Sequence, residues 1–558
     1  MKIALVNNQV VIAEPGDLYG RLKAYMKWNK SRHRLEAPVS LELLQALATM
    51  FNLPPRIAAE YQLIQDRLGR IEREKNNDNP VPLMKIPVKA NLYKHQVRGI
   101  NCALIAMQTE HSGFGFLFDM GLGKTLTTIG TIGAMYKQGK IKKVLVVAPS
   151  SVCAVWPKDL AAFADFNYFT AVLIGDKKKR LKELDAANSR IWTNELRILI
   201  INYESVWRDE IFIGLNEFDP DLIICDESQR IKTHNAAQSK ALHKLGDNAR
   251  YKIILSGTPI QNNCLDFYSQ YRFLDSSVFG KNFYAYRNRY CQMGGYQNHQ
   301  IVAYKDQENL IKKAHSIAYR VTKEEALDLP EQTFENRYVS FTPKERKLYN
   351  ELKRVSVAEL ENEETVTAPT VLTKMLRLQQ LTGGFIISDE GERPQQIGTS
   401  KLDALKEILE DYVLEGCGKL VIFARFTPEV EAIQKLLEKL KIKYTAIHGG
   451  VPLEQRGGIV DDFQNNPDTK VFVCNTACAG LGITLTAAHV AVYYSLSFNY
   501  ADYAQSLARI HRLTQKNNCH YINLLVEDSI DDLCLEALEK KEDIAKSLVD
   551  NWRQVFND

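Results

Sequence analysis

The sequence lacks any long apolar run and any pair of cysteines at CxxC spacing. No uninterrupted apolar segment approaches the roughly 20 residues that a membrane-spanning helix needs. The opening stretch MKIALVNNQVVIAEPGD has too short an apolar run and the wrong flanks for a secretory signal peptide. The ten cysteines are scattered through apolar runs without a CxxC spacing, which argues against a zinc site and favours buried, reduced thiols. We therefore expect a cytoplasmic protein.

The sequence also lacks a strong charge imbalance, internal repeats and low-complexity segments. Lys and Arg number 71 against 67 Asp and Glu, a formal net charge of +4. This balance neither requires nor excludes a nucleic-acid partner, for which a local basic groove would be needed. A length of 558 residues, 45% of them hydrophobic and 25% charged, is ordinary for a soluble enzyme. It predicts roughly three or four domains.

Two stretches, residues 81–275 and 400–530, alternate short apolar runs with helical segments. The runs are FGFLF, KVLVVAPS, RILIINYES, DLIICDES and YKIILSGT in the first stretch, and KLVIFAR, YTAIHGG, KVFVCNT, VAVYYS and HYINLLV in the second. Near-continuous apolar strands that alternate with helices predict a parallel sheet with both faces covered. The fold class is therefore α/β, with two tandem parallel-sheet lobes.

The remaining stretches have a different texture. Residues 1–80 predict a small α+β accessory domain, with a hairpin around Asn7-Asn8 followed by two helical segments and a polar break. Residues 276–399 show little strand pattern and predict helical insertions with the connection between the lobes. Residues 531–558 have apolar residues at helical spacing, and we expect this C-terminal helix to pack back on the lobes.

The stretch DMGLGKT, residues 119–125, directly follows the apolar run FGFLF. Gly121 and Gly123 would let backbone N–H groups, including those of Met120 and Leu122, close around phosphates. Lys124 would neutralise the phosphates, and the Thr125 hydroxyl would hold Mg²⁺. The full phosphate-loop pattern has glycine where this chain has Phe118. The alternative is a glycine-rich turn with a chance Lys-Thr.

An acidic pair ends another predicted strand, in LIICDES. Asp226 would hold Mg²⁺, and Glu227 would orient or deprotonate an attacking water. An ordinary strand end with a helix cap would also favour Asp-Glu-Ser. The second stretch ends in QSLARIHRLTQK, where Arg509 and Arg512 would share one helix face and could stabilise charge on a γ-phosphate. Two surface arginines are the alternative.

These segments, in this order, resemble a superfamily-two helicase-like ATPase of the Swi/Snf type over about residues 88–540. The resemblance lies in LYKHQVRGI, DMGLGKT, LVVAPSSVCAVWPKDLAAF, ILIINYESV, DESQRIKTHNAAQSKAL, LSGTPIQNN, YRVTKEEALDLP, KLVIFARF, IHGGVPLEQRGGIVDDFQ, CNTACAGLGITLTAAHVAV and QSLARIHRLTQ. It departs from the family pattern at Phe118-Asp119, Ala477, Thr484, Ala508 and Thr514. These departures bear on lobe coupling and rate.

The resemblance implies two RecA-like lobes that bind ATP and Mg²⁺. It implies that Gln96 reads adenine, that Gly480 lies on the nucleotide side, and that Ser256-Gly257-Thr258 couples the nucleotide site to the DNA site. It also implies backbone contacts to DNA from strand-end loops of both lobes: Pro149, Ser150, Asn202, Tyr203, His448, Gly449, Asn475 and Thr476.

The family generally moves along double-stranded DNA without separating its strands. We therefore expect a DNA-dependent ATPase that translocates on duplex DNA, as a monomer, with residues 1–80 available to a protein partner. The absence of evident chromatin-reading modules favours a bacterial or phage-infected cell. Two alternatives remain open: a strand-separating or annealing enzyme at forks or recombination intermediates, and an ATP-gated factor that displaces another protein from nucleic acid.

Overall fold

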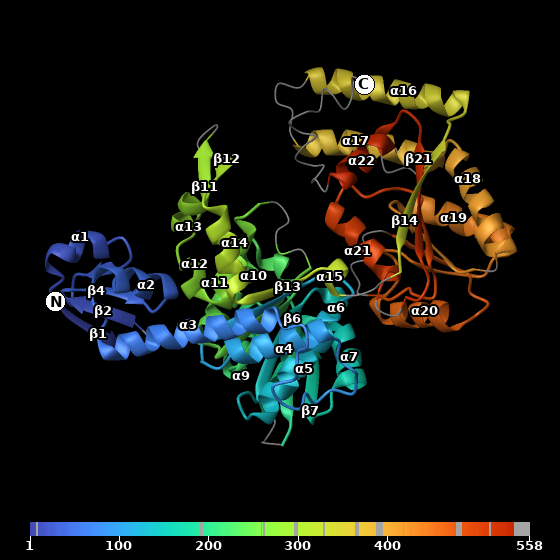
Figure 1. Cartoon of the computed structure of the whole chain (residues 1–558). Coiled ribbons are helices and arrows are strands. Elements are labelled where there is room, and N and C mark those ends of the chain that lie inside the picture. The colour runs from blue at the N-terminus through green and yellow to red at the C-terminus, as the bar shows by residue number, and fades with distance from the viewer. Residues whose placement is uncertain are drawn as a thin grey trace. The chain divides into compact units, whose positions relative to one another are not determined.

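The computed structural model describes residues 1–540 except for 7–8, 190–193, 258, 260–262, 295–299, 327–329, 363–367, 387–393, 417, 476–482 and 513–514. The chain divides into two compact units, the first reaching Thr322 and the second running from Lys323 onward (Figure 1). The short loop Met120–Leu122 groups with the second unit in this division. No helix in the described part of the chain is long and apolar enough to span a membrane.

The first unit begins with a four-stranded antiparallel sheet in the order β1-β2-β4-β3. Its elements are β1 (Lys2–Val6), β2 (Gln9–Ala13), α1 (Tyr19–Leu22), β3 (Lys27–Asn29), β4 (Arg34–Pro38) and α2 (Leu41–Met50). The predicted hairpin is confirmed, since β1 and β2 pair antiparallel; its turn at Asn7-Asn8 lies outside the described residues. A small core that includes Val10, Leu35 and Leu44 holds α2 to the sheet.

A long helix, α3 (Pro55–Lys75), connects this accessory domain to the first lobe. Proline at its first position suits a helix start, where the missing N–H would have no partner within the helix. Its C-terminal part contacts α4 (Lys94–Ala106), and the Asn101 side-chain amide donates to Glu74 at 2.7 Å. The accessory domain and the lobe are therefore joined by a packed helix.

The first lobe is a seven-stranded parallel sheet in the order β13-β5-β10-β9-β6-β8-β7. Its strands are β5 (Ser112–Phe118), β6 (Lys143–Ala148), β7 (Tyr168–Leu173), β8 (Leu196–Asn202), β9 (Leu222–Asp226), β10 (Tyr251–Leu255) and β13 (Ala318–Val321). The helices between them are α5 (Lys124–Lys137), α6 (Ser150–Cys153), α7 (Val155–Phe163), α8 (Lys177–Asn188), α9 (Asp209–Phe218), α10 (Ala237–Asn248) and α11 (Asp266–Leu274). All five strands predicted for this stretch are present.

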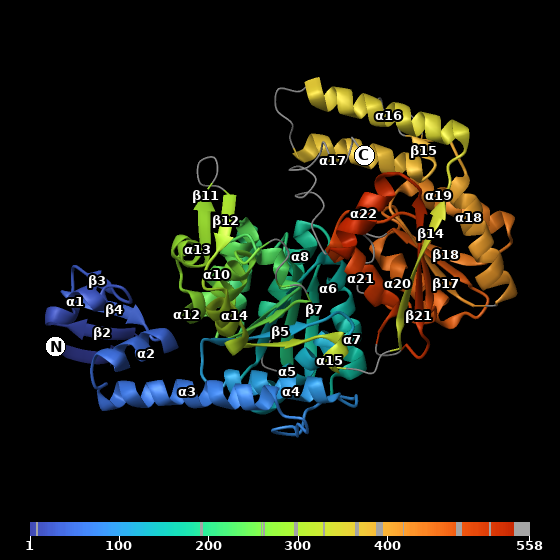
Figure 2. The same cartoon turned by 45° about the horizontal axis from the view of Figure 1, so that its top comes forward.

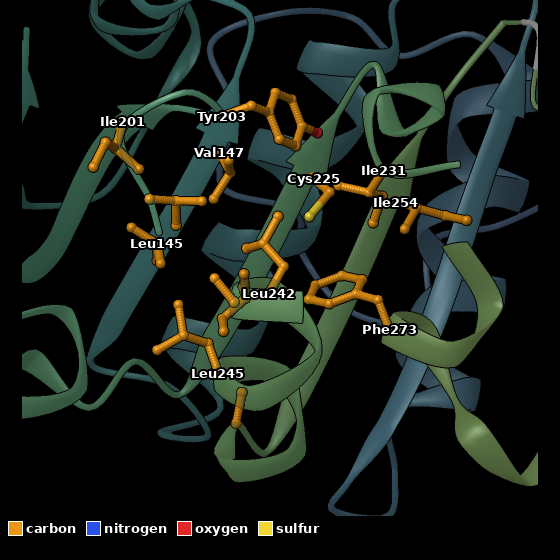
Figure 3. Close-up of a cluster of buried hydrophobic side chains, with 14 of the residues drawn as sticks. Leu145, Val147, Ile201, Tyr203, Cys225, Ile231, Leu242, Leu245, Ile254 and Phe273 are labelled. Carbon is orange, nitrogen blue, oxygen red and sulfur yellow. The ribbon is translucent and has the colours of Figure 1, made fainter. Parts of the chain in front are cut away.

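Helices cover this sheet on both faces. Figure 3 shows one face, where Leu145 and Val147 of β6 point toward Leu242 and Leu245 of α10. On α4, a Cβ added at Gly99 would lie 3.0–3.3 Å from Phe118 and Phe116 of β5 and from Thr127 of α5. Because both faces of the sheet are buried, its strands are apolar along their length, and this made them predictable from the sequence.

Further elements follow this sheet before the second unit. They are α12 (Ser276–Phe279), α13 (Phe283–Tyr290), the antiparallel pair β11 (Cys291–Gly294) and β12 (Gln300–Tyr304), and α14 (Gln307–Ser316). An aromatic cluster of Tyr268, Tyr286 and Tyr290 packs with Leu310 of α14.

The second unit is a six-stranded parallel sheet in the order β14-β21-β20-β17-β19-β18. Its strands are β14 (Gln332–Val339), β17 (Leu420–Ala424), β18 (Tyr444–Ile447), β19 (Val471–Asn475), β20 (Val490–Tyr493) and β21 (Cys519–Val526). Its helices are α15 (Lys323–Ala326), α16 (Pro343–Asn362), α17 (Ala368–Thr382), α18 (Ser400–Leu409), α19 (Thr427–Lys439), α20 (Leu453–Asn465), α21 (Tyr500–Ile510) and α22 (Ile530–Glu539), with a π-helical turn at Glu410–Glu415 and a short pair β15 (Phe385–Ile386) and β16 (Gln395–Gln396).

Alternation along β17 divides this lobe into two cores. Val421 and Phe423 belong to the core with α17, α20, α21 and α22, whereas Leu420 and Ile422 belong to the core with α18 and α19. Figure 2 shows α18 and α19 on one side of the sheet. Packing of α22 on this lobe agrees with the expected C-terminal helix, although residues 541–558 lie outside the described part.

The expectation that residues 276–399 contain little strand structure is wrong. Within this stretch, β13 adds an edge strand to the first sheet and β14 adds one to the second. Both were overlooked for a physical reason. β13 is only four residues long, and β14 is a half-exposed edge strand whose sequence QTFENRYV has no continuous apolar run.

Candidate active site

The glycine-rich loop joins β5 to α5 and adopts the backbone that only glycine takes easily. Gly121 has φ 90° and Gly123 has φ 77°, both in the left-handed region. A Cβ added at Gly123 would lie 2.2 Å from the Gln96 side-chain nitrogen. Glycine at position 123 is thus required both by the backbone turn and by the close approach of Gln96.

Gln96 is fully buried at the start of α4, where it also helps to begin the helix. Its Oε1 accepts a hydrogen bond from the Tyr93 backbone N–H at 3.0 Å, as part of a capping box. The other end of the amide therefore faces Gly123. The structure brings together two predicted nucleotide residues that lie 27 positions apart in the sequence.

Lys124 opens α5 and lies among carboxylates. Its Nζ donates to the Phe118 carbonyl at 2.9 Å. Burial lowers the pKa of Lys124, while the charges of Glu227, Asp226 and Asp119 act in the opposite direction. Asp119 itself pairs with Arg320 of β13 at 2.6 Å. The strand that the sequence analysis overlooked therefore supplies a fixed cation beside the loop.

Asp226 ends β9 and is held by three groups from neighbouring segments. The Trp156 indole N–H donates to its Oδ2 at 3.0 Å, and the Glu227 backbone N–H donates to its Oδ1 at 2.9 Å. The Tyr203 hydroxyl donates to its backbone carbonyl at 2.7 Å. Burial, followed by the adjacent Glu227 charge, raises the pKa of Asp226 to about 7, whereas Trp156 and Lys124 lower it.

Glu227 occupies a left-handed backbone position, with φ 51°, and leads into a chain of hydrogen bonds. The Gln229 side-chain N–H donates to Glu227 Oε2 at 2.8 Å, and the Ser256 hydroxyl donates to Gln229 Oε1 at 2.8 Å. Ser256 is predicted from the sequence, whereas Gln229 is not, because its only signal is its place in DESQRIK. Gly257 follows Ser256, whereas Thr258 lies outside the described residues.

The proposed metal ligands have suitable chemistry. Thr125, the second residue of α5, offers a hydroxyl, and Asp226 offers a carboxylate that keeps lone pairs beyond its two hydrogen bonds. Mg²⁺ prefers such oxygen ligands, with waters and substrate phosphates completing the shell. No group of three His, Cys, Asp or Glu side chains that could hold a metal ion occurs among the described residues. The two residues therefore fit a Mg²⁺-nucleotide site.

The two arginines of the second lobe do not share a helix face, contrary to the sequence prediction. Arg509 lies in α21, but the helix ends at Ile510 and Arg512 lies beyond it. The Arg512 guanidinium donates to Thr484 Oγ1 at 2.6 Å and to the Ala508 carbonyl at 2.9 Å. Thr484, one of the departures from the family pattern, thus positions Arg512. Gly480 lies outside the described residues.

The residues predicted to contact DNA from the first lobe lie at the carboxyl ends of the neighbouring strands β6 and β8. Pro149 precedes α6, and Ser150 accepts a hydrogen bond from the Asn202 side chain at 2.9 Å. Tyr203 is a correction: it is 1% exposed, and its hydroxyl is bound to the Asp226 carbonyl. Its O–H therefore supports the acidic pair and does not reach a phosphate (Figure 3).

The corresponding residues of the second lobe lie at the carboxyl ends of β18 and β19. Gly449 is exposed and His448 is half-buried, with His448 Nδ1 accepting from the Gly450 N–H at 3.2 Å. The Asn475 side chain donates to the Arg425 carbonyl at 2.6 Å. Thr476 lies outside the described residues. The structure thus places His448, Gly449 and Asn475 at the carboxyl ends of two neighbouring strands of one sheet.

Comparison with protein families decides what this arrangement is. Residues 95–383, more than half of the chain, match the SNF2-related domain, and residues 400–514 match the helicase conserved C-terminal domain. The chain belongs to the SNF2-related family. Both matched segments carry site residues described above, and the accessory domain precedes them.

Curated relatives are about one quarter identical to the chain over the residues that align. An uncharacterized ATP-dependent helicase of Mycoplasma genitalium is 25% identical over 83% of the chain and 42% of its own length. The ISWI chromatin-remodeling complex ATPase of Saccharomyces cerevisiae is 25% identical over 81% of the chain and 40% of its own length. The chain therefore spans about two fifths of these two relatives.

A third relative and a solved structure complete the comparison. The SWI/SNF-related matrix-associated actin-dependent regulator of chromatin subfamily A-like protein 1 homolog of Caenorhabditis elegans is 28% identical over 81% of the chain and 61% of its own length. The SWI2/SNF2 ATPase core of Sulfolobus solfataricus, solved in complex with double-stranded DNA, is 25% identical over 84% of the chain and 95% of its own, with a TM-score of 0.40.

Proposed function

We propose that this SNF2-related protein is a DNA-dependent ATPase that couples ATP hydrolysis to translocation on double-stranded DNA. The observation that carries the proposal is the first-lobe site. There, a glycine loop and Lys124 lie with the acidic pair Asp226-Glu227, and Glu227 connects through Gln229 to Ser256. A site built only to bind a nucleotide would not need an acid pair that is connected by hydrogen bonds to the end of a neighbouring strand.

The chain's own residues perform the ATP chemistry in this proposal. Gln96 binds the adenine, the loop N–H groups and Lys124 bind the phosphates, and Glu227 orients the attacking water. Mg²⁺ held by Thr125 and Asp226 would neutralise charge on the phosphates. Arg509 and Arg512 act as the arginine fingers, as the sequence predicts. Because Gln229 bonds both Glu227 and Ser256, a shift of the Glu227 carboxylate on hydrolysis would move the end of β10.

The relatives support DNA as the polymer. RAD54-like proteins of Drosophila, named for DNA repair and recombination, are 25% identical to the chain over 83% of its length. In the first lobe, Ser150 and Asn202 form a polar pair at the carboxyl edge of β6 and β8. Such groups bind backbone phosphates without reading sequence, which suits a protein that moves along a duplex.

The test measures phosphate release with and without nucleic acid. Plain duplex DNA should raise the ATPase rate at least several-fold over the rate without DNA, whereas RNA should not. Efficient unwinding of a plain duplex in a strand-displacement assay would favour the strand-separating alternative. ATP binding without hydrolysis under every condition would favour the ATP-gated factor.

A further inference from the structure

Two cysteines of the first unit lie side by side, although they are 27 positions apart in the sequence. Cys264 lies two residues before α11, and Cys291 is the first residue of β11. Their Sγ atoms are 3.4 Å apart. A disulfide bond is about 2 Å long, so the sulfurs would need to approach by about 1.4 Å to form one. Rotation of the side chains between staggered positions can supply such a movement.

Hydrogen bonds fix the backbone of both cysteines. The Tyr286 hydroxyl donates to the Cys264 carbonyl at 2.7 Å, and Cys264 packs against the aromatic cluster that contains Tyr286. The Cys291 backbone N–H donates to the Arg287 carbonyl at the end of α13, which leads into β11 (Figure 1). Cys291 also pairs with Tyr304 in the register of β11 and β12. Packing of the lobe therefore brings the two sulfurs together.

The two thiols differ in their access to solvent. Of the eight cysteines in the described part of the chain, Cys264 is partly exposed and the other seven are buried. A small oxidant can therefore reach Cys264 first, and the buried Cys291 is placed to react second. Burial raises the pKa of both thiols, that of Cys264 to about 12. Because thiolate is then scarce at neutral pH, the pair should respond to sustained oxidation and not to a brief exposure.

We propose that Cys264 and Cys291 are a modification site, at which a peroxide produces a reversible disulfide bond. The Cys264 thiolate attacks one peroxide oxygen, the O–O bond breaks, and the hydroxide that leaves takes up a proton to become water. The Cys291 sulfur then attacks the resulting sulfenic acid. The S–S bond forms, the S–O bond breaks, and the second hydroxide leaves as water with the proton of Cys291.

The electrons and atoms of this reaction balance. Two thiols and one hydrogen peroxide give one disulfide and two waters. Each sulfur loses one electron, and the peroxide gains two. A dithiol reductant reverses the reaction by thiol–disulfide exchange.

The bond would restrain the segment that joins β10 to α11. At the start of this segment, the Ser256 hydroxyl donates to the Gln229 side chain. Farther along, the Pro259 carbonyl accepts from the Gln270 side chain of α11 at 2.7 Å, and Gln270 Oε1 accepts from the Ser228 hydroxyl at 2.7 Å. The segment is therefore connected at two points to the residues that directly follow the acidic pair.

Cys264 lies in the same segment, so a disulfide bond to Cys291 would fasten that segment to β11. This consequence rests on the proposed function, in which hydrolysis moves the end of β10. A fastened segment should move less, and turnover should fall when the bond forms and recover when it is reduced.

The test treats the full chain with hydrogen peroxide and then blocks the remaining thiols with iodoacetamide. Mass spectrometry of a non-reducing digest should detect a peptide in which Cys264 is joined to Cys291. Phosphate release in the presence of duplex DNA should fall about five-fold in the oxidised protein and return to its starting rate after treatment with dithiothreitol.

Three variants separate this bond from other effects of peroxide. Cys264→Ser and Cys291→Ser should each show parental turnover when reduced and keep that turnover after peroxide. Cys102→Ser is the matched control, because it removes a buried thiol of α4, which donates to the Ile71 carbonyl in the same unit. It should lose turnover on oxidation as the parent does. Thermal melting of the reduced variants, followed by circular dichroism, establishes that the fold is intact.

A parent protein in which no peptide joins Cys264 to Cys291 after peroxide, whether the thiols stay intact or become sulfinic acids, would overturn the site. A joined peptide found only in dimers on a non-reducing gel would overturn it as well. A joined peptide with unchanged turnover would overturn the restraint on the segment. The proposed function fails separately, if duplex DNA does not stimulate the ATPase of the reduced parent while the disulfide bond is still detected.

Discussion

Both lobes are built on parallel sheets, but the helices that follow β5 in the first lobe and β17 in the second begin in opposite ways. In the first lobe, α5 follows β5 through a loop with two left-handed glycines, and within the described residues no side chain caps the helix. In the second lobe, α19 follows β17, and its N-terminus is capped by the chain's own Glu429. Its Oε2 accepts from the N–H groups of Arg425 and Phe426 at 3.0 and 3.1 Å, and from the Ser495 hydroxyl at 2.6 Å.

This difference offers a physical reason why the nucleotide site is proposed for the first lobe. A helix N-terminus attracts an anion because its first N–H groups have no partner within the helix. In the second lobe a carboxylate already meets that need. In the first lobe the N–H groups at the start of α5 are available to a phosphate, and Lys124 is the first residue of that helix. The start of α19 is thus closed by a side chain of the protein itself, whereas the start of α5 is not.

The largest effect should come from the first-lobe acid that carries the chemistry. Glu227→Gln keeps the size of the side chain but removes the charge that orients water, so turnover should fall about a thousand-fold. Lys124→Ala should abolish turnover as well. Phosphate release with saturating duplex DNA measures both. Lys137→Ala, at the far end of α5, is the control and should retain parental turnover; retained turnover in Glu227→Gln would remove Glu227 from the site.

A smaller loss should follow a change in the second lobe. Arg512→Ala should lower kcat about a hundred-fold, because a guanidinium stabilises charge that develops on the γ-phosphate. Nucleotide affinity, measured with a fluorescent ATP analogue, should change little. Thr484→Val, which removes the hydroxyl that positions Arg512, should give an intermediate loss. An Arg512→Ala protein with parental kcat would exclude Arg512 as a catalytic group.

A substitution at Gly123 should perturb the uncapped N-terminus of α5 in the first lobe. Gly123→Ala places a Cβ in a left-handed turn, at a cost of about 1 kcal/mol, and against the Gln96 amide. The KM for ATP should rise about ten-fold. Gln96→Ala in the same chain removes the clash but not the turn strain, so the double variant should bind ATP better than the sum of the single effects predicts. Strictly additive effects of the two substitutions on ATP binding would contradict a contact between residue 123 and Gln96.

The smallest effect on turnover should come from the capped helix start of the second lobe. Glu429→Gln weakens three hydrogen bonds to a buried carboxylate and should lower the free energy of unfolding by about 1–3 kcal/mol. Turnover per folded molecule should not change. Urea denaturation and ATPase assays on the same preparation separate the two quantities. A loss of turnover larger than the loss of folded protein would give Glu429 a functional role.

The central strands of both sheets could be predicted because each is buried on both faces and therefore apolar along its length. The edge strand β7 (YFTAVL) was overlooked because most of its residues are only partly buried. The ends of elements were equally difficult: nothing in RIHRL marks Ile510 as the last helical residue, so Arg512 was placed on α21. Motif residues show which chemistry is present, whereas packing decides where each of their side chains points. Tyr203 fits the pattern of a DNA contact, yet its ring fills the core beside Cys225.

The hydrogen bond from Trp156 to Asp226 has a practical consequence for spectroscopy. The indole is fully buried and donates directly to the carboxylate expected to hold the metal. Any change in charge at that carboxylate should therefore alter the emission of Trp156. The difference in fluorescence between the parent protein and Trp156→Phe is the signal that comes from Trp156. The protein thereby carries an optical probe, built into its own core, for following nucleotide loading in real time without a label.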